Sequence, residues 1–361
     1  MCVLRGEEKL ISLYGGFLDA DCQRPWKEET LVGIGSGTKG VVVACLLHAM
    51  QEAGVNLDSH ISDLWPAFAQ GGKRAMTLGQ LLSHRSGLCA PNDIHLKILD
   101  KEGIVRSIEK QDPLPLPRSG SAYSPHLFAY ALEEILRRLT GGEALSEYWR
   151  RVFGGPLGID LWIGLPESEN DRVATLRAPE RGMLDGCELI FARAFADPDS
   201  LVHKAFTRPA NLPGGIAEWN TPPIWASSLP SVGGIASAEG LAKFYALLAN
   251  GGVQNGTTFF KQQTLDWMST RLTQGFDLVL QCDMAFSAGF MMDPLDSSGQ
   301  KIRSLFGASG SAFGHIGLGG SLGFADPERR TGFAYLMNNW EAGVLPRKRC
   351  TDLVDAIYSA D

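Results

Sequence analysis

The sequence predicts an α+β fold in which an antiparallel sheet is flanked by helices and a mainly helical region is inserted. Strand-like runs occupy both ends of the chain, and helical periodicity dominates the middle. Sheets with helices packed on them are one of the stable layer arrangements of domains. We therefore expect residues 1–56 and 231–361 to form one sheet region and residues 57–230 a mainly helical region. The active site would lie between the two.

The N-terminal segment predicts two strands, a third short strand and the first helix. Residues 2–15 alternate in polarity around a turn and end at a pair of glycines. The apolar run at 31–34 leads into a glycine-rich stretch at 35–40 (GSGTKG), and a helix follows over 37–53. Gly54 is the expected C-cap of that helix.

Short amphipathic segments with capping residues predict that the middle region is mainly helical. A threonine N-cap begins a short helix over 77–84, and helical spacing recurs over 101–110, 124–140 and 145–153. Residues 154–230 are rich in Gly and Pro, so we expect an irregular connection that forms one wall of a site.

The C-terminal part returns to strands after one clear helix. Ser237 is the expected N-cap of an amphipathic helix that stops at residues 251–252, and a final helix is expected over 347–358. Between these helices the strand-like runs are 277–282, 286–292, 312–317, 320–325 and 332–337.

Composition excludes several classes of function. Lys and Arg total 33 and Asp and Glu total 40, so the formal charge is 33 − 40 = −7, without a basic run. A nucleic-acid partner or an anionic membrane partner is therefore not expected. The sequence has neither a run of about 18 apolar residues nor a secretory signal pattern. Seven scattered cysteines without a C-x-x-C pair favour free thiols, a cytoplasmic location and no metal or other cofactor.

The glycine-rich stretch contains a candidate nucleophile. Ser36 and Lys39 lie one helical turn apart at the start of a helix. A serine needs a base, and a lysine whose pKa is lowered by burial and a neighbouring cation can serve as one. The same serine-x-x-lysine spacing is also typical of an exposed, polar helix start. A third interpretation, the G-x-G-x-x-G dinucleotide motif, lacks the second strand ending in an acid that it requires.

Two further stretches offer partners for Ser36. Tyr123 follows a turn-rich loop and could carry a proton, although a half-buried packing tyrosine is the alternative. His315 lies on a glycine-dense strand edge, where it could place partial positive charge beside Lys39 or be structural. Nearby, Ser321 matches the G-x-S-x-G nucleophile elbow. That motif requires a later histidine, but His315 is the last one in the chain.

Together these motifs resemble the serine β-lactamase and penicillin-binding-protein superfamily in its class C-like branch, and especially the family VIII carboxylesterases. Residues 36–40 (SGTKG) resemble the S-x-T-K-G motif, and residues 81–88 (LLSHRSGL) resemble a second family segment. Residues 117–123 match the spacing of the tyrosine motif, and 157–167 (LGIDLWIGLPE) resemble another stretch. Residues 313–328 resemble F-G-H-x-G-x-G-G-S-L-G-F-A-D-P-E.

The resemblance implies a β-lactamase/transpeptidase-like fold and assigns roles to individual residues. Ser36 would be the acylated nucleophile, and Lys39 and Tyr123 would shuttle protons. The backbone N–H groups of Ser36 and Leu318 would form the oxyanion hole. The resemblance also assigns substrate binding to the three positions where penicillin-binding proteins have K-T-G. These positions are His315, Ile316 and Gly317.

Departures from the family pattern favour esters over β-lactams. Pro125 stands where class C β-lactamases have asparagine, and His315 replaces a lysine that would bind a substrate carboxylate. Arg118 replaces a motif glycine. The chain begins inside the first strand, whereas relatives usually have a helix before it. Either the sheet face that this helix covers would be open, or the start would be truncated. A homo-oligomer is among the expected partners, together with a small-molecule ester substrate.

The predicted function is a serine carboxylesterase that acts on small, short-acyl esters through an acyl-Ser36 intermediate, with water or another hydroxyl as acceptor. The alternatives are a β-lactamase or D-Ala-D-Ala-type peptidase and, in another class, a catalytically silent ligand-binding scaffold. Six large apolar residues are candidates either for an acyl pocket or for plain core: Trp162, Trp219, Trp225, Phe290, Met291 and Trp340.

Overall fold

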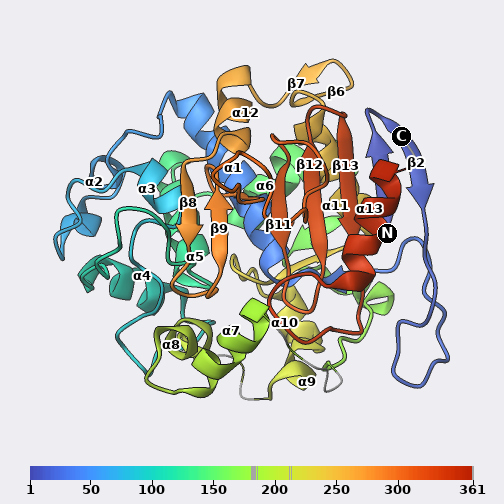
Figure 1. The fold of residues 1–361 in the computed structure, drawn as a ribbon, viewed down its shortest axis with the longest axis horizontal. Helices are drawn as coiled ribbons and strands as arrows, with labels where there is room; N and C mark the ends of the chain where they lie inside the picture. Colours follow the sequence, from blue (N-terminus) through green and yellow to red (C-terminus); the bar gives the residue numbers. More distant parts are fainter. Residues whose placement is uncertain (180–183, 185, 211, 213, 360–361) are drawn as a thin grey trace.

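An eight-stranded sheet dominates the structure, a computed structural model that describes residues 1–179, 184, 186–210, 212 and 214–359. The strand order is β2-β1-β13-β12-β11-β10-β9-β8, and every neighbouring pair is antiparallel (Figure 1). The first strand of the chain lies beside the last, so both ends of the chain build one sheet, as the sequence predicts.

The described part of the chain contains the following elements. The strands are β1 (Cys2–Arg5), β2 (Glu8–Ser12), β3 (Val32–Gly33), β4 (Leu161–Ile163), β5 (Gly234–Ala236), β6 (Val253–Gln254), β7 (Thr257–Thr258), β8 (Thr273–Phe276), β9 (Asp283–Phe286), β10 (Met291–Met292), β11 (Phe313–Ile316), β12 (Leu322–Asp326) and β13 (Thr331–Tyr335). The helices are α1 (Thr38–Ala53), α2 (Ile61–Leu64), α3 (Leu78–Leu82), α4 (Lys101–Lys110), α5 (Leu127–Leu139), α6 (Leu145–Trp149), α7 (Gly186–Ala196), α8 (Leu201–Thr207), α9 (Ile216–Trp219), α10 (Pro222–Ala226), α11 (Ala238–Ala249), α12 (Gln262–Ser269) and α13 (Lys348–Ser359).

Helices cover both faces of the large sheet. Helix α11 packs on β1, β12 and β13, and α1 connects the sheet to the helical region through α5 and α6. Gly332 on β13 allows α11 to come close, because a Cβ there would lie 2.3 Å from the backbone nitrogen of Ala246. Figure 1 shows α13 over β13 on the other face, next to the N-terminal strand.

The face that the sequence suggested would be open is covered at the first strand. Val3 and Phe333 are fully buried, and Cys350 and Val354 of α13 belong to the same apolar cluster. Successive residues of a strand point to opposite faces. Thus Leu4, next to Val3, packs instead into the main core, the cluster to which α1 and α11 also contribute.

Strand β3 belongs to a separate three-stranded sheet, in the order β3-β5-β4, with antiparallel pairings. A dinucleotide-binding fold requires parallel strands, so that interpretation of residues 35–40 is excluded. The hydroxyl of Thr38 accepts a hydrogen bond from the N–H of Gly234 at 2.8 Å, which ties the start of α1 to β5. The small sheet therefore holds the start of α1, shortly after Ser36.

Most predicted elements are confirmed, and three predictions are wrong. Residues 277–282 are a turn between β8 and β9, not a strand. Residues 287–290, within the predicted strand over 286–292, form a second turn between β9 and β10. Residues 154–230 are not irregular throughout, because their described part holds β4 and the helices α7 to α10. The helix expected from residue 124 begins at Leu127.

Within the described residues, no helix is both long enough and apolar enough to span a membrane. All seven cysteines are free thiols. The division into residues 1–56 with 231–361 and residues 57–230 stays a prediction.

Candidate active site

Ser36 lies in a single 3-10 turn, Gly35–Gly37, between β3 and α1. The first N–H groups of a helical segment have no acceptor within it, so the N–H of Ser36 is available at the positive end of α1. Its side chain is half-buried and lines a large cavity. The positions of β3 and α1 therefore present this serine to a ligand.

Lys39 is fully buried on the first turn of α1. Its Nζ lies 3.0 Å from Oγ of Ser36 and donates to the carbonyl oxygen of Ser231 at 2.9 Å. Burial lowers the pKa of Lys39 well below its ordinary value of 10.5. The sequence analysis also invoked a neighbouring cation, but burial is the cause that acts here. A neutral amine with a free lone pair can accept the proton of Ser36.

Tyr123 completes the group around Ser36. The tyrosine is 3% exposed, and Nζ of Lys39 lies 5.4 Å from the centre of its ring. Burial raises the pKa of the Tyr123 hydroxyl above its ordinary value, and a hydrogen bond to Ser36 offsets this rise in part. Tyr123 is therefore protonated at neutral pH and can donate a proton, while its catalytic role stays a prediction.

The loop that carries Tyr123 is held by a buried carboxylate that the sequence analysis did not identify. One oxygen of Asp277 accepts the hydroxyl of Ser121 at 2.6 Å and the N–H of Tyr123 at 2.8 Å. The other accepts the N–H groups of Val279 and Leu280 at 2.9 and 2.8 Å. Asp277 is fully buried. These four bonds explain why residues 277–282 form a turn, and they fasten that turn to the Tyr123 loop.

We expect Asp277→Asn to lower kcat by about 10- to 100-fold with a much smaller change in KM, because small displacements of a catalytic group are costly. Asparagine keeps one acceptor oxygen, and its amide nitrogen would face two donors. Ester turnover and thermal unfolding should be measured for this variant and for Ser121→Ala, which removes one donor only and should lose less than about tenfold. An unchanged kcat in a folded Asp277→Asn protein would contradict the positioning role.

The histidines near Ser36 are neutral. Burial, followed by the charge of Lys39, lowers the pKa of His315 to about 3, and its Nδ1 lies 2.7 Å from the carbonyl oxygen of Ile316. His315 is therefore uncharged beside Lys39, and its role in substrate binding stays a prediction. Burial also lowers the pKa of His126 to about 3. Both side chains pack beside the site as uncharged groups.

His84 and Ser231 also contact the site, although sequence reasoning assigned them no role. The His84 ring lies 4.9 Å from the Tyr123 ring, and its Nδ1 accepts the N–H of Ser124 at 3.3 Å. The signal for His84 was present in the LLSHRSGL segment, since it belongs to a motif of the superfamily. Nothing local marks Ser231, whose carbonyl oxygen binds Lys39.

A tight turn places a second backbone donor next to Ser36. Leu318 follows β11, and its N–H donates no hydrogen bond to any residue in the described ranges. An added Cβ on Gly35 would lie 3.5 Å from this nitrogen, so the two segments are in contact. The N–H groups of Ser36 and Leu318 thus lie on adjoining segments at the cavity, as an oxyanion hole requires. Ile316, which is buried, and Gly317 lead into this turn.

Ser321 has a structural role in this turn. Its carbonyl oxygen accepts the N–H of Gly317 at 2.7 Å, and its hydroxyl donates to the carbonyl oxygen of Ile34 at 3.3 Å. A Cβ on Gly317 would lie 2.1 Å from that hydroxyl, so only glycine fits. Strand β12 follows Ser321, whereas a nucleophile elbow leads into a helix. The G-x-S-x-G match is therefore incidental, in agreement with the argument from chain order.

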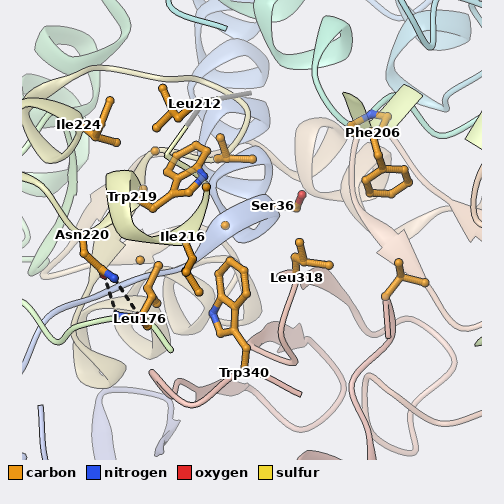
Figure 2. A pocket seen from close by; sticks show the side chains of 18 of the residues that line it. Ser36, Leu176, Phe206, Leu212, Ile216, Trp219, Asn220, Ile224, Leu318 and Trp340 are labelled. Carbon is orange, nitrogen blue, oxygen red and sulfur yellow. Dashed lines mark hydrogen bonds between the residues drawn. The ribbon is translucent and has the colours of Figure 1, made fainter. Parts of the chain in front are cut away.

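A cavity of about 510 Å³ opens beside Ser36 (Figure 2). Of the six candidates for an acyl pocket, Trp219, Trp225 and Trp340 line it. The other three do not belong to its described lining: Phe290 and Met291 are buried in the core, and Trp162 packs under Arg150, whose guanidinium carbon lies 4.1 Å from the centre of the indole. Over the described ranges, no three His, Cys, Asp or Glu side chains are grouped to hold a metal ion.

Comparison with known proteins identifies the family. The beta-lactamase family matches residues 1–352 of the sequence. The chain belongs to the beta-lactamase family. The resemblance read from the motifs is therefore confirmed over nearly the whole chain.

Relatives of this beta-lactamase-family protein include esterases. It is 25% identical to the esterase/beta-lactamase LipL of Mycobacterium tuberculosis over 341 residues, which cover 92% of this chain and 74% of that protein. A penicillin-binding-protein homologue from Caulobacter crescentus has a TM-score of 0.87 and 32% identity, covering 100% of this chain and 91% of the other. A family VIII carboxylesterase has a TM-score of 0.85 and 29% identity, with the same coverage. The fold is thus that of β-lactamases and transpeptidases.

Proposed function

We propose that this protein is a serine carboxylesterase that hydrolyses small esters, including short-acyl ones, or transfers their acyl groups, through an acyl-Ser36 intermediate. The observation that carries the proposal is the 3.0 Å contact between Ser36 and a fully buried Lys39 whose pKa is lowered. The names of its relatives, an esterase/beta-lactamase and a family VIII carboxylesterase, support the same class of reaction.

The first half of the reaction acylates Ser36. The neutral amine of Lys39 accepts the hydroxyl proton while Oγ of Ser36 attacks the ester carbonyl carbon. Negative charge develops on the carbonyl oxygen between the N–H groups of Ser36 and Leu318. When the C–O bond of the ester breaks, the leaving alkoxide takes the proton of Tyr123, and the ammonium of Lys39 returns a proton to the tyrosine oxygen.

The second half releases the acyl group. Water, or another alcohol, gives a proton to the lysine and tyrosine pair and attacks the acyl carbonyl carbon. The bond to Oγ then breaks, and Ser36 recovers its proton. Hydrolase and acyltransferase activity differ only in which hydroxyl enters at this step, so both fit the proposal.

The alternatives receive less support from the site. A β-lactamase or D-Ala-D-Ala-type peptidase must bind a substrate carboxylate, yet His315 is neutral and Pro125 offers no amide at the position of the class C asparagine. A silent scaffold would not need a buried lysine beside a serine. The partner that we propose is a small ester, and cytoplasmic location and homo-oligomerisation stay predictions from sequence.

Turnover of two chromogenic substrates tests the proposal. We expect kcat/KM for p-nitrophenyl butyrate to exceed that for nitrocefin, a cephalosporin, by at least about 100-fold. The reason is that the carboxylate of nitrocefin would bind without a counter-ion, at a free-energy cost that corresponds to this factor. Faster turnover of nitrocefin would favour the β-lactamase alternative. Absence of turnover with either substrate would favour the silent scaffold.

A further inference from the structure

The cavity beside Ser36 is much larger than a short acyl group. Its volume is about 510 Å³. At roughly 30 Å³ for each non-hydrogen atom, the share of one water molecule in the liquid, this space holds about 17 such atoms. A butyryl group would leave most of the cavity unfilled, and the apolar atoms on its walls would lack contacts.

The walls of this cavity are mainly apolar over the residues that the structure describes. Lys and Arg do not occur among its described lining residues. The acid in the wall, Glu188, is occupied, because its two oxygens accept the N–H groups of Val344 and Leu345, each at 2.9 Å. His126 is neutral. A negatively charged group entering the cavity would therefore lose its hydration without gaining a counter-ion from the described lining.

Hydrogen bonds within the wall hold the cavity open. The side chain of Asn220 accepts the N–H of Leu176 at 2.7 Å and donates to the carbonyl oxygen of the same residue at 2.9 Å (Figure 2). The indole of Trp225 donates to the carbonyl oxygen of Trp219 at 2.8 Å. Together with Glu188, these contacts fix three parts of the wall, so the space is preformed rather than opened by a ligand.

The position of Tyr123 shows which part of an ester enters the cavity. Ser36 and Leu318 belong to the described lining, whereas Tyr123 does not. The leaving alkoxide must be close to Tyr123 to receive its proton. The acyl group lies on the other side of the reacting carbon, and Figure 2 shows the space around Ser36 and Leu318 that extends toward Trp219 and Trp340.

On the basis of the proposed acyl-enzyme reaction, we propose that the preferred substrates carry a large, uncharged, apolar acyl group of about eight carbons or an aromatic acid of similar size. Short-acyl esters are then accepted but use a small part of the binding surface. Phe191, Phe206, Leu212, Trp219, Ile224 and Trp340 are the aromatic and aliphatic side chains that would determine this specificity.

The test compares p-nitrophenyl acetate, butyrate and octanoate with the mono-p-nitrophenyl ester of suberic acid, whose eight-carbon acyl group ends in a carboxylate. We expect kcat/KM to rise at least about tenfold from acetate to octanoate. The suberate ester should be at least about tenfold slower than octanoate, because the described lining of the cavity offers its carboxylate no cation.

A substitution that fills part of the cavity, compared with a matched control, tests whether the acyl group binds there. Ala192 of α7 lines the cavity and is half-buried, whereas Ala196 at the end of the same helix is exposed and outside the described lining. Ala192→Phe should lower the ratio of octanoate to acetate turnover about tenfold. Ala196→Phe adds the same side chain to the same helix and should leave the ratio within about twofold.

The outcomes separate this inference from the proposed function. Turnover of acetate with a flat or falling series toward octanoate overturns the inference and leaves the esterase intact. Equal effects of Ala192→Phe and Ala196→Phe overturn the assignment of the cavity as the acyl site. Failure to hydrolyse any of these esters overturns the proposed function itself. If Ala192→Phe does not fold, the wild-type series still decides.

Discussion

Replacement of Ser36 by alanine is expected to lower kcat for p-nitrophenyl butyrate by at least about 10³-fold, with little change in the free energy of unfolding. The hydroxyl oxygen is the atom that forms the acyl bond, so no neighbouring group can replace it. The side chain is half-buried, and its removal would cost Lys39 and Tyr123 one hydrogen bond each. Steady-state hydrolysis and thermal unfolding of both proteins provide the comparison.

Ser321→Ala is the matched control for this variant. Ser321 fits a sequence motif for a nucleophile, but its hydroxyl donates to the carbonyl oxygen of Ile34 and holds a turn. We expect Ser321→Ala to retain at least about a tenth of the wild-type kcat and to lose about 1 kcal/mol of stability. Complete inactivation by Ser321→Ala, with activity remaining in Ser36→Ala, would exchange the two assignments.

Replacement of Lys39 by methionine is expected to lower kcat by about 10²- to 10⁴-fold, the usual contribution of a general base. Methionine has nearly the length of lysine without its amine, and position 39 is fully buried in an apolar environment. Ser36 would remain in place but would keep its proton. A Lys39→Met protein with wild-type kcat would show that another group deprotonates the serine.

The same variant should be more stable than the wild type at neutral pH. Lys39 has a lowered pKa in the folded protein, whereas the unfolded chain has the ordinary value of 10.5. Between these two values the unfolded state binds more protons, so the free energy of unfolding of the wild type rises with pH. Below the folded pKa, lysine is protonated in both states and contributes no slope.

Unfolding by urea at several pH values between about 6 and 10 measures this linkage. The difference in stability between Lys39→Met and the wild type should shrink as pH rises toward 10.5, the ordinary lysine value. The buried histidines are common to both proteins and cancel in the difference. A difference that stays constant over this range would mean that Lys39 is protonated in the folded state.

Much of the fold could be predicted from the sequence because the signals are local. The helix over Lys101–Lys110 matches the prediction at both ends, and its N-cap, Asp100, accepts the N–H of Gly103 at 2.9 Å. Gly54 takes the left-handed conformation expected of a C-cap. Ser36 and Lys39 were predicted for a similar reason, since their spacing in a helix brings them together without long-range contacts.

Long-range contacts account for what could not be predicted. Residues 278–280 are apolar and suggest a strand, but they form a turn because Asp277 accepts the N–H groups of Val279, Leu280 and Tyr123. The neutral state of His315 follows from burial by several distant segments. The cavity likewise combines α7, α8, α9 and the loop of Trp340, which sequence spacing does not relate.

The most direct test of the account is the mass of the protein during turnover. Wild-type protein mixed with p-nitrophenyl butyrate and quenched in acid should carry one butyryl group, and peptide mapping should place it on Ser36. The Ser36→Ala protein should remain unmodified under the same conditions. An adduct on another residue, or rapid ester turnover without an adduct on Ser36 at any quench time, would contradict the acyl-Ser36 mechanism.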